Sequence, residues 1–288
     1  MLGWLVTNKY LVGEKFSLLK SKLISEAKSL DIDLVSIDNL QTRKIISDKN
    51  YKKPDFVLFW DKDINLGLQL KNDGLKLYND IETIRICDDK ALTYLTLNKY
   101  NIPMPKTIPS PQSFGTNIST DKDFLEYINN EFSFPYIIKE CFGSFGMQVY
   151  LSHNQNETLD IINKINGKAF IVQEFIKTSE SRDVRIEIVN KKALCAMYRK
   201  NETGDFRSNL TLGAKSYYYE PTIEQVDLAE KVADILNLDF GGIDILFGDN
   251  DAPILNEVNS NAHFINLTNV SKINVANEIL NYIKNDLR

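Results

Sequence analysis

The first 60 residues contain three short apolar runs. Between the first and the second lies a longer stretch in which apolar residues recur every three or four positions. The runs at 2–6, 33–37 and 55–60 have the pattern of buried strands. The stretch at 14–30, between the first two runs, predicts an amphipathic helix. Its apolar stripe consists of Phe16, Leu19, Leu23, Ala27 and Leu30. Strands joined through helices run in the same direction, so this region predicts an α/β lobe with a parallel sheet.

The rest of the chain predicts antiparallel strands with a few helices. The expected strands lie at 134–140, 147–151, 168–175, 183–189 and 192–199, with a helix near 155–165 among them. A capping box formed by Thr222 and Gln225 predicts a helix from Thr222 to Leu236. Apolar residues at core spacing predict a closing amphipathic helix from Ser271 to Ile283.

The segment from Asp244 to Asn259 is predicted to form a hairpin, because a turn-forming cluster at 248–253 separates two apolar runs. Folding about this turn sets Asp244 opposite Glu257. Side chains alternate along a strand, so Glu257 and Asn259 face the same side, beside Asp244. Hard cations such as Mg²⁺ prefer oxygen ligands of this kind. A solvated hairpin face is the alternative, but an unpaired carboxylate is costly in strands that look like core, which favours a metal site.

Lys90 stands where an anion is expected. It follows Asp88 and Asp89, which look like the N-cap and the first-turn acid of a helix. Its ammonium group would then lie at the positive end of the helix dipole, which is unfavourable. A phosphate bound between them would be attracted to both, which makes the same arrangement favourable. The alternative is a solvated lysine that pairs with one of the two aspartates.

Lys139 ends an apolar run immediately before a loop that contains Gly143 and Gly146. Backbone amides of such a loop can close over phosphates while Lys139 supplies a point charge. The loop lacks the Gly-Lys-Ser/Thr ending of a P-loop, and no helix is predicted directly after it, so P-loop and dinucleotide-binding motifs are excluded. An ordinary hairpin turn is the alternative explanation for the two glycines.

Composition narrows the class of protein. A chain of 288 residues with 43% hydrophobic content can form two or three compact lobes. The proline-rich stretch at 102–111 is typical of a linker between the first lobe and the rest. A formal net charge of −5 argues against nucleic acid as a partner. A local group of cations nevertheless suits an anionic ligand. It contains Arg182, Arg185, Arg199, Lys200, Arg207 and Lys215.

The sequence contains no run that approaches the ~20 apolar residues needed to span a bilayer. The first residues also lack the features of a signal peptide, so we expect a cytoplasmic protein with no membrane partner. Cys87, Cys141 and Cys195 are scattered along the chain, which predicts neither disulfides nor a zinc site. We expect them to be buried as small apolar side chains.

Taken in order, several motifs resemble those of ATP-grasp ligases, and specifically the RimK-type family of ribosomal protein S6 glutamate ligase. These motifs are CDDK at 87–90, IIKECFGSFG at 137–146, VQEFI at 172–176, RDVR at 182–185, GDFRSNL at 204–210, GGID at 241–244 and NEVNSN at 256–261. The resemblance implies an α/β (α+β) ATP-grasp fold. Residues 1–85 would form an N-terminal α/β lobe, and 86–288 the ATP-grasp domain. Within that domain, the central lobe would cover about 105–175 and the C-terminal, metal-binding lobe about 176–288.

The resemblance also implies roles for individual residues in binding ATP. Lys90 and Lys139 would hold its phosphates, and Asp183 would lie near the ribose. The mobile lid would comprise Gly143, Ser144, Phe145 and Gly146, although Met147 and Gln148 stand where the family often has another glycine. The adenine hinge would comprise Glu174, Phe175 and Ile176, and Arg185 is a further residue expected at the nucleotide.

Two further sets of residues follow from the resemblance. Asp244, Glu257 and Asn259 would bind two Mg²⁺ or Mn²⁺ ions. The transferring phosphate and acyl group would be surrounded by Arg199, Arg207 and Asn209. Asn256 and Ser260 alternate with the metal ligands along the strand, so we expect them to face away and to support those ligands.

The activity implied is ATP-dependent ligation of a carboxylate to an amine through an acyl phosphate. The amine would be an amino acid such as glutamate, and the carboxylate would belong to a peptide, a protein tail or a cofactor. A homodimer or tetramer is expected by the same resemblance. Three alternatives remain open: a peptide-modifying or ring-forming ligase, an ATP-responsive binding module without turnover, and a kinase. His153 and His263 stand in no nucleophile-activating motif, although His263 could contact a substrate.

Overall fold

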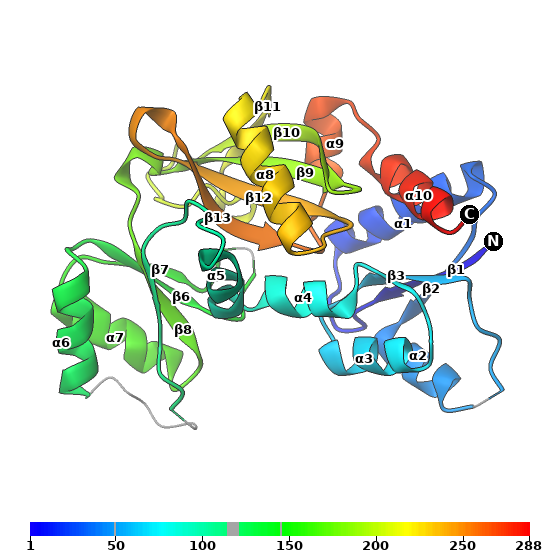
Figure 1. Ribbon diagram of the computed structural model, residues 1–288, viewed down its shortest axis with the longest axis horizontal. Coiled ribbons are helices and arrows are strands. Elements are labelled where there is room, and N and C mark those ends of the chain that lie inside the picture. Colours follow the sequence, from blue (N-terminus) through cyan, green and yellow to red (C-terminus); the bar gives the residue numbers. More distant parts are fainter. Residues whose placement is uncertain (49, 114–120, 145) are drawn as a thin grey trace.

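The computed structural model describes residues 1–48, 50–113, 121–144 and 146–288. These residues form two four-stranded sheets and one five-stranded sheet. The five-stranded sheet lies above the other two in Figure 1, and the parallel N-terminal sheet and the central antiparallel sheet lie at opposite ends below it. The mixed α/β architecture expected from the sequence is confirmed.

The N-terminal sheet is parallel, as predicted from the alternation of strands and helices. Its strands, in spatial order, are β2 (Asp33–Asp38), β1 (Leu2–Thr7), β3 (Phe56–Trp60) and β4 (Leu77–Tyr78). The helices of this region are α1 (Glu14–Ser29), α2 (Asn39–Ile46) and α3 (Ile64–Asn72). Leu19, Leu23 and Ala27 of the predicted stripe are buried on α1. Their burial confirms the amphipathic assignment of this helix.

Two consecutive helices, α4 (Ile81–Asp88) and α5 (Lys90–Asn98), connect the N-terminal sheet to the rest (Figure 1). Asp89 caps α5, because its carboxylate accepts hydrogen bonds from the backbone amides of Ala91 and Leu92. The prediction that Asp88 would be the N-cap is wrong: Asp88 ends α4 and pairs with Lys62. Lys90 is the first residue of α5 and so lies at a helix start, as expected.

The central sheet is antiparallel and contains part of the proline-rich stretch. Its strands, in order, are β5 (Thr107–Pro109), β8 (Phe170–Glu174), β6 (Tyr136–Glu140) and β7 (Val149–Ser152). Helices α6 (Lys122–Glu131) and α7 (Gln155–Ile165) contribute to the same hydrophobic core. The linker prediction for 102–111 is therefore wrong in part, because β5 is a strand. A proline is tolerated there because β5 lies at the edge of the sheet.

The five-stranded sheet is antiparallel, and α8 (Ile223–Ile235) covers one of its faces (Figure 1). Its strands, in order, are β11 (Lys215–Tyr219), β10 (Lys192–Lys200), β9 (Arg182–Val189), β12 (Phe240–Phe247) and β13 (Pro253–Asn259). Both hydrogen bonds of the predicted capping box, between Thr222 and Gln225, are present. Short 3-10 turns are η1 (Lys177–Ser179), η2 (Leu210–Leu212) and η3 (Asp249–Asp251).

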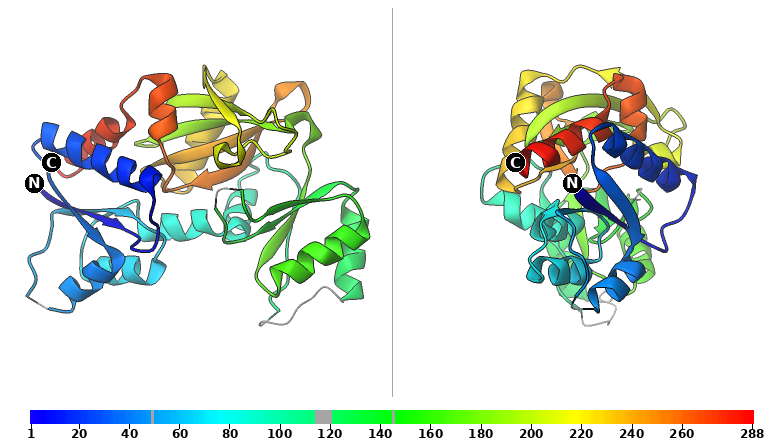
Figure 2. Two further views of the ribbon diagram at one scale, coloured as in Figure 1. Left: turned by 180° about the vertical axis from the view of Figure 1, so that it is seen from behind. Right: turned by 90° about the vertical axis from the view of Figure 1, so that its right-hand side faces the viewer.

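The chain closes with two helices, α9 (Ile265–Ser271) and α10 (Val275–Asp286). The closing amphipathic helix predicted from Ser271 to Ile283 is confirmed as α10, but its predicted start is wrong because Ser271 is the last residue of α9. Lys272 has a left-handed backbone (φ 64°) that ends α9, and the Asn274 side chain caps α10. Helix α10 packs against α1, so both chain ends lie at the N-terminal sheet (Figure 2). Among the described residues, no helix has the length and apolar character to cross a membrane.

Candidate functional site

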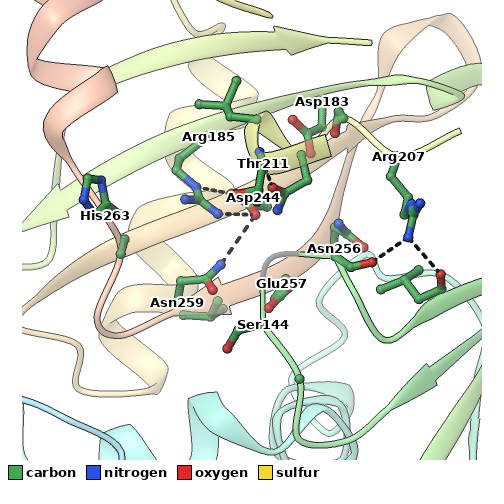
Figure 3. Close-up of a pocket in the computed structure, with 18 of the residues that line it drawn as sticks. Ser144, Asp183, Arg185, Arg207, Thr211, Asp244, Asn256, Glu257, Asn259 and His263 are labelled. Atoms are coloured by element: carbon green, nitrogen blue, oxygen red, sulfur yellow. Dashed lines mark hydrogen bonds and ion pairs between the residues drawn. The ribbon is translucent and has the colours of Figure 1, made fainter. Parts of the chain in front are cut away.

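A pocket of about 540 Å³ is lined by residues from all three sheets. Figure 3 shows part of this lining. Every predicted site residue in the described part of the chain lines it; Phe145 lies outside the described residues. These lining residues are Lys90, Lys139, Gly143, Ser144, Gly146, Glu174, Phe175, Ile176, Asp183, Arg185, Arg199, Arg207, Asn209, Asp244, Glu257 and Asn259. The fold therefore brings together side chains that are up to 169 positions apart, from Lys90 to Asn259.

The β12–β13 hairpin pairs Asp244 directly with Glu257, which confirms the predicted register. The Asn259 amide lies 3.4 Å from Oδ2 of Asp244, on the same face (Figure 3). A register shift follows this pair, because Ile245 pairs with Leu255 and leaves Asn256 as an extra residue. The expectation that Asn256 faces away is wrong: its side-chain oxygen accepts a hydrogen bond of 2.9 Å from Lys139.

Two arginines hold the Asp244 carboxylate. Arg185 donates to both of its oxygens, at 2.6 and 2.7 Å, and Arg199 lies 3.0 Å from Oδ2. Arg199 also donates to both oxygens of Asp183, at 2.6 and 2.5 Å. The side chains of Asp183, Arg199 and Asp244 are at most 5% exposed. Although burial opposes the charged form, Arg185 and Arg199 hold the pKa of Asp244 below its usual value.

The donor set of the hairpin fits a divalent cation. Asp244 and Glu257 supply two carboxylates and Asn259 an amide oxygen, which is the oxygen-rich, partly protein-derived set that Mg²⁺ accepts when phosphates complete its coordination. Glu257 is the accessible member, with a side chain 29% exposed and 3.9 Å from the Lys90 ammonium group. A cation at Asp244 would compete for oxygens that Arg185 and Arg199 contact.

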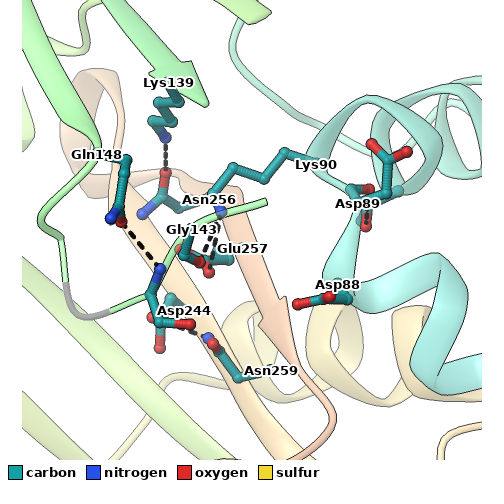
Figure 4. A network of polar contacts seen from close by, with 12 residues as sticks. Asp88, Asp89, Lys90, Lys139, Gly143, Gln148, Asp244, Asn256, Glu257 and Asn259 are labelled. Carbon is teal, nitrogen blue, oxygen red and sulfur yellow. Dashed lines mark hydrogen bonds and ion pairs between the residues drawn. The ribbon is translucent and has the colours of Figure 1, made fainter. Parts of the chain in front are cut away.

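Lys139 and Lys90 approach this hairpin from the central sheet and from α5 (Figure 4). Lys139 is buried, and this burial lowers its pKa to about 8 despite the opposing effect of the Glu257 charge. The Lys90 ammonium group donates to the Gly143 carbonyl oxygen at 3.2 Å. The two lysines therefore place cationic groups beside the carboxylates of the hairpin.

The glycine loop between β6 and β7 is held by polar contacts on both sides. The Ser144 amide donates to the Gln148 side chain at 3.2 Å, and Arg207 donates to the Gly146 carbonyl at 2.7 Å. Arg207 also forms a bidentate pair with Asp205, at 2.9 and 2.7 Å. In this conformation Arg207 therefore links the loop to the five-stranded sheet.

The remaining predicted residues lie around the same pocket. Phe175 packs edge-to-face against Phe206, with ring centroids 6.4 Å apart. The Glu174 carboxylate accepts from the backbone amide of Lys106 at 3.3 Å. Asn209 accepts a hydrogen bond from the Thr211 amide at 2.9 Å and so caps η2. Phe175 and Phe206 therefore contribute apolar surface to the pocket lining.

The sequence interpretation missed the wall contributed by the N-terminal lobe. Asn8, Lys15, Trp60 and Asp61 line the pocket together with Asn259 and His263. His263 is joined to this lobe by a 2.9 Å contact between its Nε2 and the Lys15 carbonyl oxygen. No local motif marks these residues, because they meet the hairpin only through tertiary packing.

Glu187 was also missed, although a signal for it exists in the sequence. It follows Asp183 and Arg185 at strand spacing, so the alternation along β9 places it on the same face as the site. Glu187 is 1% exposed, and its two carboxylate oxygens have no hydrogen-bond partner among the described residues. The three cysteines are buried and unpaired, as predicted.

The RimK-like ATP-grasp domain model matches residues 87–283 of this chain. The uncharacterized protein MG012 homolog of Mycoplasma pneumoniae is 35% identical, with 79% of this chain and 80% of its own length covered. N-acetylaspartylglutamate synthase A of Homo sapiens is 28% identical over 77% of this chain and 56% of its own length. A probable alpha-L-glutamate ligase of Maridesulfovibrio salexigens is 29% identical, over 75% of this chain and 69% of its own length.

Solved structures share the fold at low sequence identity. The D-cycloserine synthetase DcsG superposes with a TM-score of 0.75 at 14% identity, covering 100% of both chains. A D-alanine–D-alanine ligase from Bacillus anthracis, complexed with ATP, has a TM-score of 0.76 at 16% identity and covers 100% of this chain and 97% of its own. These matches extend the likeness in fold to the N-terminal lobe, which the domain model does not cover.

Proposed function

Because the chain belongs to the RimK-like ATP-grasp family, we propose that it joins the carboxylate of an acceptor to the amine of an amino acid through an acyl phosphate. It is an ADP-forming ligase of carbon–nitrogen bonds. The observation that carries the proposal is the single pocket in which Lys90 and Lys139 face the hairpin carboxylates Asp244 and Glu257.

The proposed reaction has two steps. An oxygen of the acceptor carboxylate attacks the γ-phosphorus of ATP, the bond to the β-phosphate oxygen breaks, and ADP leaves. The amine nitrogen then attacks the carbonyl carbon of the acyl phosphate, inorganic phosphate leaves, and the amine gives up a proton. One or two divalent cations held by Asp244, Glu257 and Asn259 would neutralise charge on the phosphates. No covalent intermediate with the protein is required.

We assign the two lysines to the nucleotide phosphates. Lys139 lies in a buried position that disfavours its charge, and an anionic phosphate beside it would restore that charge. Lys90 lies at the start of α5, where the helix dipole also favours an anion. Gly143, Ser144 and Gly146 would close over the phosphates, and Phe175 with Ile176 would contact the adenine.

We assign Arg199 to the transferring phosphoryl group and the acyl oxygen, where a preorganised cation stabilises developing charge. Arg207 and Asn209 line the same pocket, and we propose that they act there once the loop has closed on ATP. Asp183 is more deeply buried than its proposed place near the ribose would require. Its paired contact with Arg199 supports a role in orienting that arginine instead.

We propose glutamate as the amine, since relatives with related sequences are named for glutamate-containing products or for ligation of glutamate. The acceptor would be a small molecule, a peptide or a protein tail that carries a carboxylate. Lys15, Arg185 and Lys62 line the pocket near the N-terminal lobe, and their charge supports an acidic substrate. A homo-oligomer remains a prediction, which size-exclusion chromatography with light scattering tests.

The test is a phosphate-release screen in which the purified protein, ATP and Mg²⁺ are combined with pairs of carboxylates and amines. Release that requires both partners, followed by a product mass equal to their sum minus water, supports the proposal. Asp244→Asn should reduce the rate at least about 100-fold. Asp249→Asn is the matched control, because Asp249 lies on the exposed turn of the same hairpin.

Three results would overturn parts of the proposal. A phosphorylated product that forms without an amine would indicate a kinase. A product lighter than a peptide acceptor by one water would indicate ring formation. Binding of ATP without any turnover, across acidic peptides and small carboxylates, would indicate a binding module.

A further inference from the structure

A cation that binds the Asp244 carboxylate would compete with the arginines that already contact it. Both oxygens already accept hydrogen bonds from Arg185, and Oδ2 also contacts Arg199. If a cation displaced Arg199 from Asp244, Arg199 would still be paired, because it also donates to both oxygens of Asp183. In the described part of the chain, the Arg185 guanidinium donates to no carboxylate other than Asp244. A cation that displaced Arg185 from Asp244 would leave this partly buried guanidinium without a carboxylate partner, which is costly.

Glu187 is the carboxyl group that could take Arg185 over. It lies two residues further along β9, on the same face, and is 1% exposed. Its two oxygens are buried without a partner among the described residues, an arrangement that is rare for a polar group. Burial raises the pKa of Glu187 to about 8, with Arg185 opposing the shift. The carboxyl group is therefore neutral in this arrangement, and the charge of Arg185 would stabilise its ionised form if the two groups paired.

A glycine leaves room for Arg185 to move between the two carboxyl groups. Gly242 pairs with Glu187 across β9 and β12, and Asp244 follows it by two positions on the same face. A Cβ atom at Gly242 would lie 3.1 Å from Cδ and 3.2 Å from Nε of Arg185. The side chain of Arg185 thus already lies over the residue that faces Glu187. Any larger side chain at 242 would obstruct this position.

We propose that Glu187 is a positioning residue that receives the Arg185 guanidinium when a divalent cation binds Asp244. Glu187 gives up its proton to water as the pair forms, so the site gains one negative charge together with the cation. Arg185 remains paired throughout, and Asp244 is freed on one side. This inference rests on the proposed function, because it assumes that Asp244 binds a cation.

The test measures the affinity for Mn²⁺ in the presence of ADP, from the electron paramagnetic resonance signal of the free ion. Glu187→Gln should weaken Mn²⁺ binding about 10-fold, the usual scale for a group that supports a metal ligand. Its affinity for ADP without metal should stay within about twofold of the unaltered protein. Glu140→Gln is the matched control, because Glu140 is also buried but pairs with Lys168, outside the pocket. Glu187→Asp should restore part of the affinity.

A second variant tests whether Glu187 acts through Arg185. In an Arg185→Met background, the further change Glu187→Gln should leave the Mn²⁺ affinity unchanged. An equal loss in both backgrounds would overturn the proposal, and so would a Glu187→Gln protein that binds Mn²⁺ normally. If Glu187→Gln does not fold, a crystal structure of the unaltered protein with ADP and Mg²⁺ decides: Arg185 within hydrogen-bonding distance of Glu187 supports the inference, and Arg185 still bidentate on Asp244 overturns it.

The same measurements separate this inference from the proposed function. If Asp244→Asn binds Mn²⁺ as tightly as the unaltered protein, the metal site itself is misassigned. If Asp244→Asn abolishes binding and Glu187→Gln does not weaken it, the metal site stands and only the role of Glu187 fails.

Discussion

The two faces of the five-stranded sheet are both buried, yet they have opposite chemistry. One face packs against α8 with Val184, Ile186, Ile188, Ile243 and Ile245. The other face carries charged residues from the alternate positions of the same strands. They are Asp183, Arg185, Glu187, Arg199 and Asp244. Burial alone therefore does not distinguish the hydrophobic core from the candidate site. The two faces differ in whether their side chains are apolar or charged.

The energetics of the two faces differ accordingly. Each fully buried Val or Ile contributes about 1.5–3 kcal/mol relative to exposure in water. Buried ions lose their hydration, and even good pairing often only offsets that loss. The apolar face thus stabilises the sheet, whereas we propose that the charged face serves to bind ligands. Substitutions on the two faces should separate stability from activity.

The largest effect is expected from breaking the charged face. Arg199→Met leaves Asp183 without its bidentate partner at a site that is at most 5% exposed. We expect the free energy of unfolding to fall by about 3–5 kcal/mol, measured by urea denaturation, together with loss of ligase activity. Arg85→Met removes an exposed ion pair on α4 and should change stability by less than about 0.5 kcal/mol. Similar stability for both variants would contradict the comparison.

The apolar face should respond differently. Ile186→Ala creates a cavity beneath α8 and should lower the free energy of unfolding by about 3 kcal/mol. Below the new melting temperature, the KM for ATP and the affinity for Mn²⁺ should stay unchanged, because no polar group of the pocket is altered. A large change in either constant would show that the two faces are coupled through the strand.

The pH dependence of stability sharpens the comparison further. Burial raises the Glu187 pKa from its usual value to about 8, so the folded protein keeps a proton that the unfolded chain releases. The stability from this group is full below pH 4.5, the usual value, and is lost as the pH rises through 8. The Glu187→Gln variant should not lose stability in this way, because glutamine does not ionise.

The unaltered ligand-free protein should lose this stability as the pH rises, and Glu187→Gln should not. We therefore expect the stability of Glu187→Gln relative to the unaltered protein to increase by about 3 kcal/mol between pH 5 and pH 8. Urea denaturation at several pH values measures the difference. Ile186→Ala is the control, because the difference between its free energy of unfolding and that of the unaltered protein should not vary with pH. A constant difference for Glu187→Gln would mean that Glu187 is ionised in the folded protein.

The smallest effect concerns the helix that covers the apolar face. Thr222→Ala removes the hydroxyl that accepts a hydrogen bond from the Gln225 amide at 3.3 Å. The expected loss in the free energy of unfolding is about 1 kcal/mol, measured by thermal denaturation. Thr222→Ser keeps the hydroxyl and should be close to neutral. Equal losses for both variants would assign the effect to the methyl group instead of the cap.

Several features of this protein followed from local sequence. The pairing of Asp244 with Glu257, the capping box of α8 and the parallel N-terminal sheet could all be predicted, because each depends on residues close together or on strand and helix periodicity. The alternation along β9 also marked Glu187 as a residue of the site face, although the motifs directed attention elsewhere.

Other features were decided by tertiary structure alone. The bulge that turns Asn256 toward Lys139 depends on contact with a distant segment. The same is true of the pocket wall from the N-terminal lobe, where Asp61 and Asn261 meet across 200 positions. The sequence also left open which arginine pairs with which carboxylate. Periodicity fixes the face of a strand that a side chain occupies, but packing between lobes selects its partner, because ion pairs and bulges are stable only where the surrounding core excludes water.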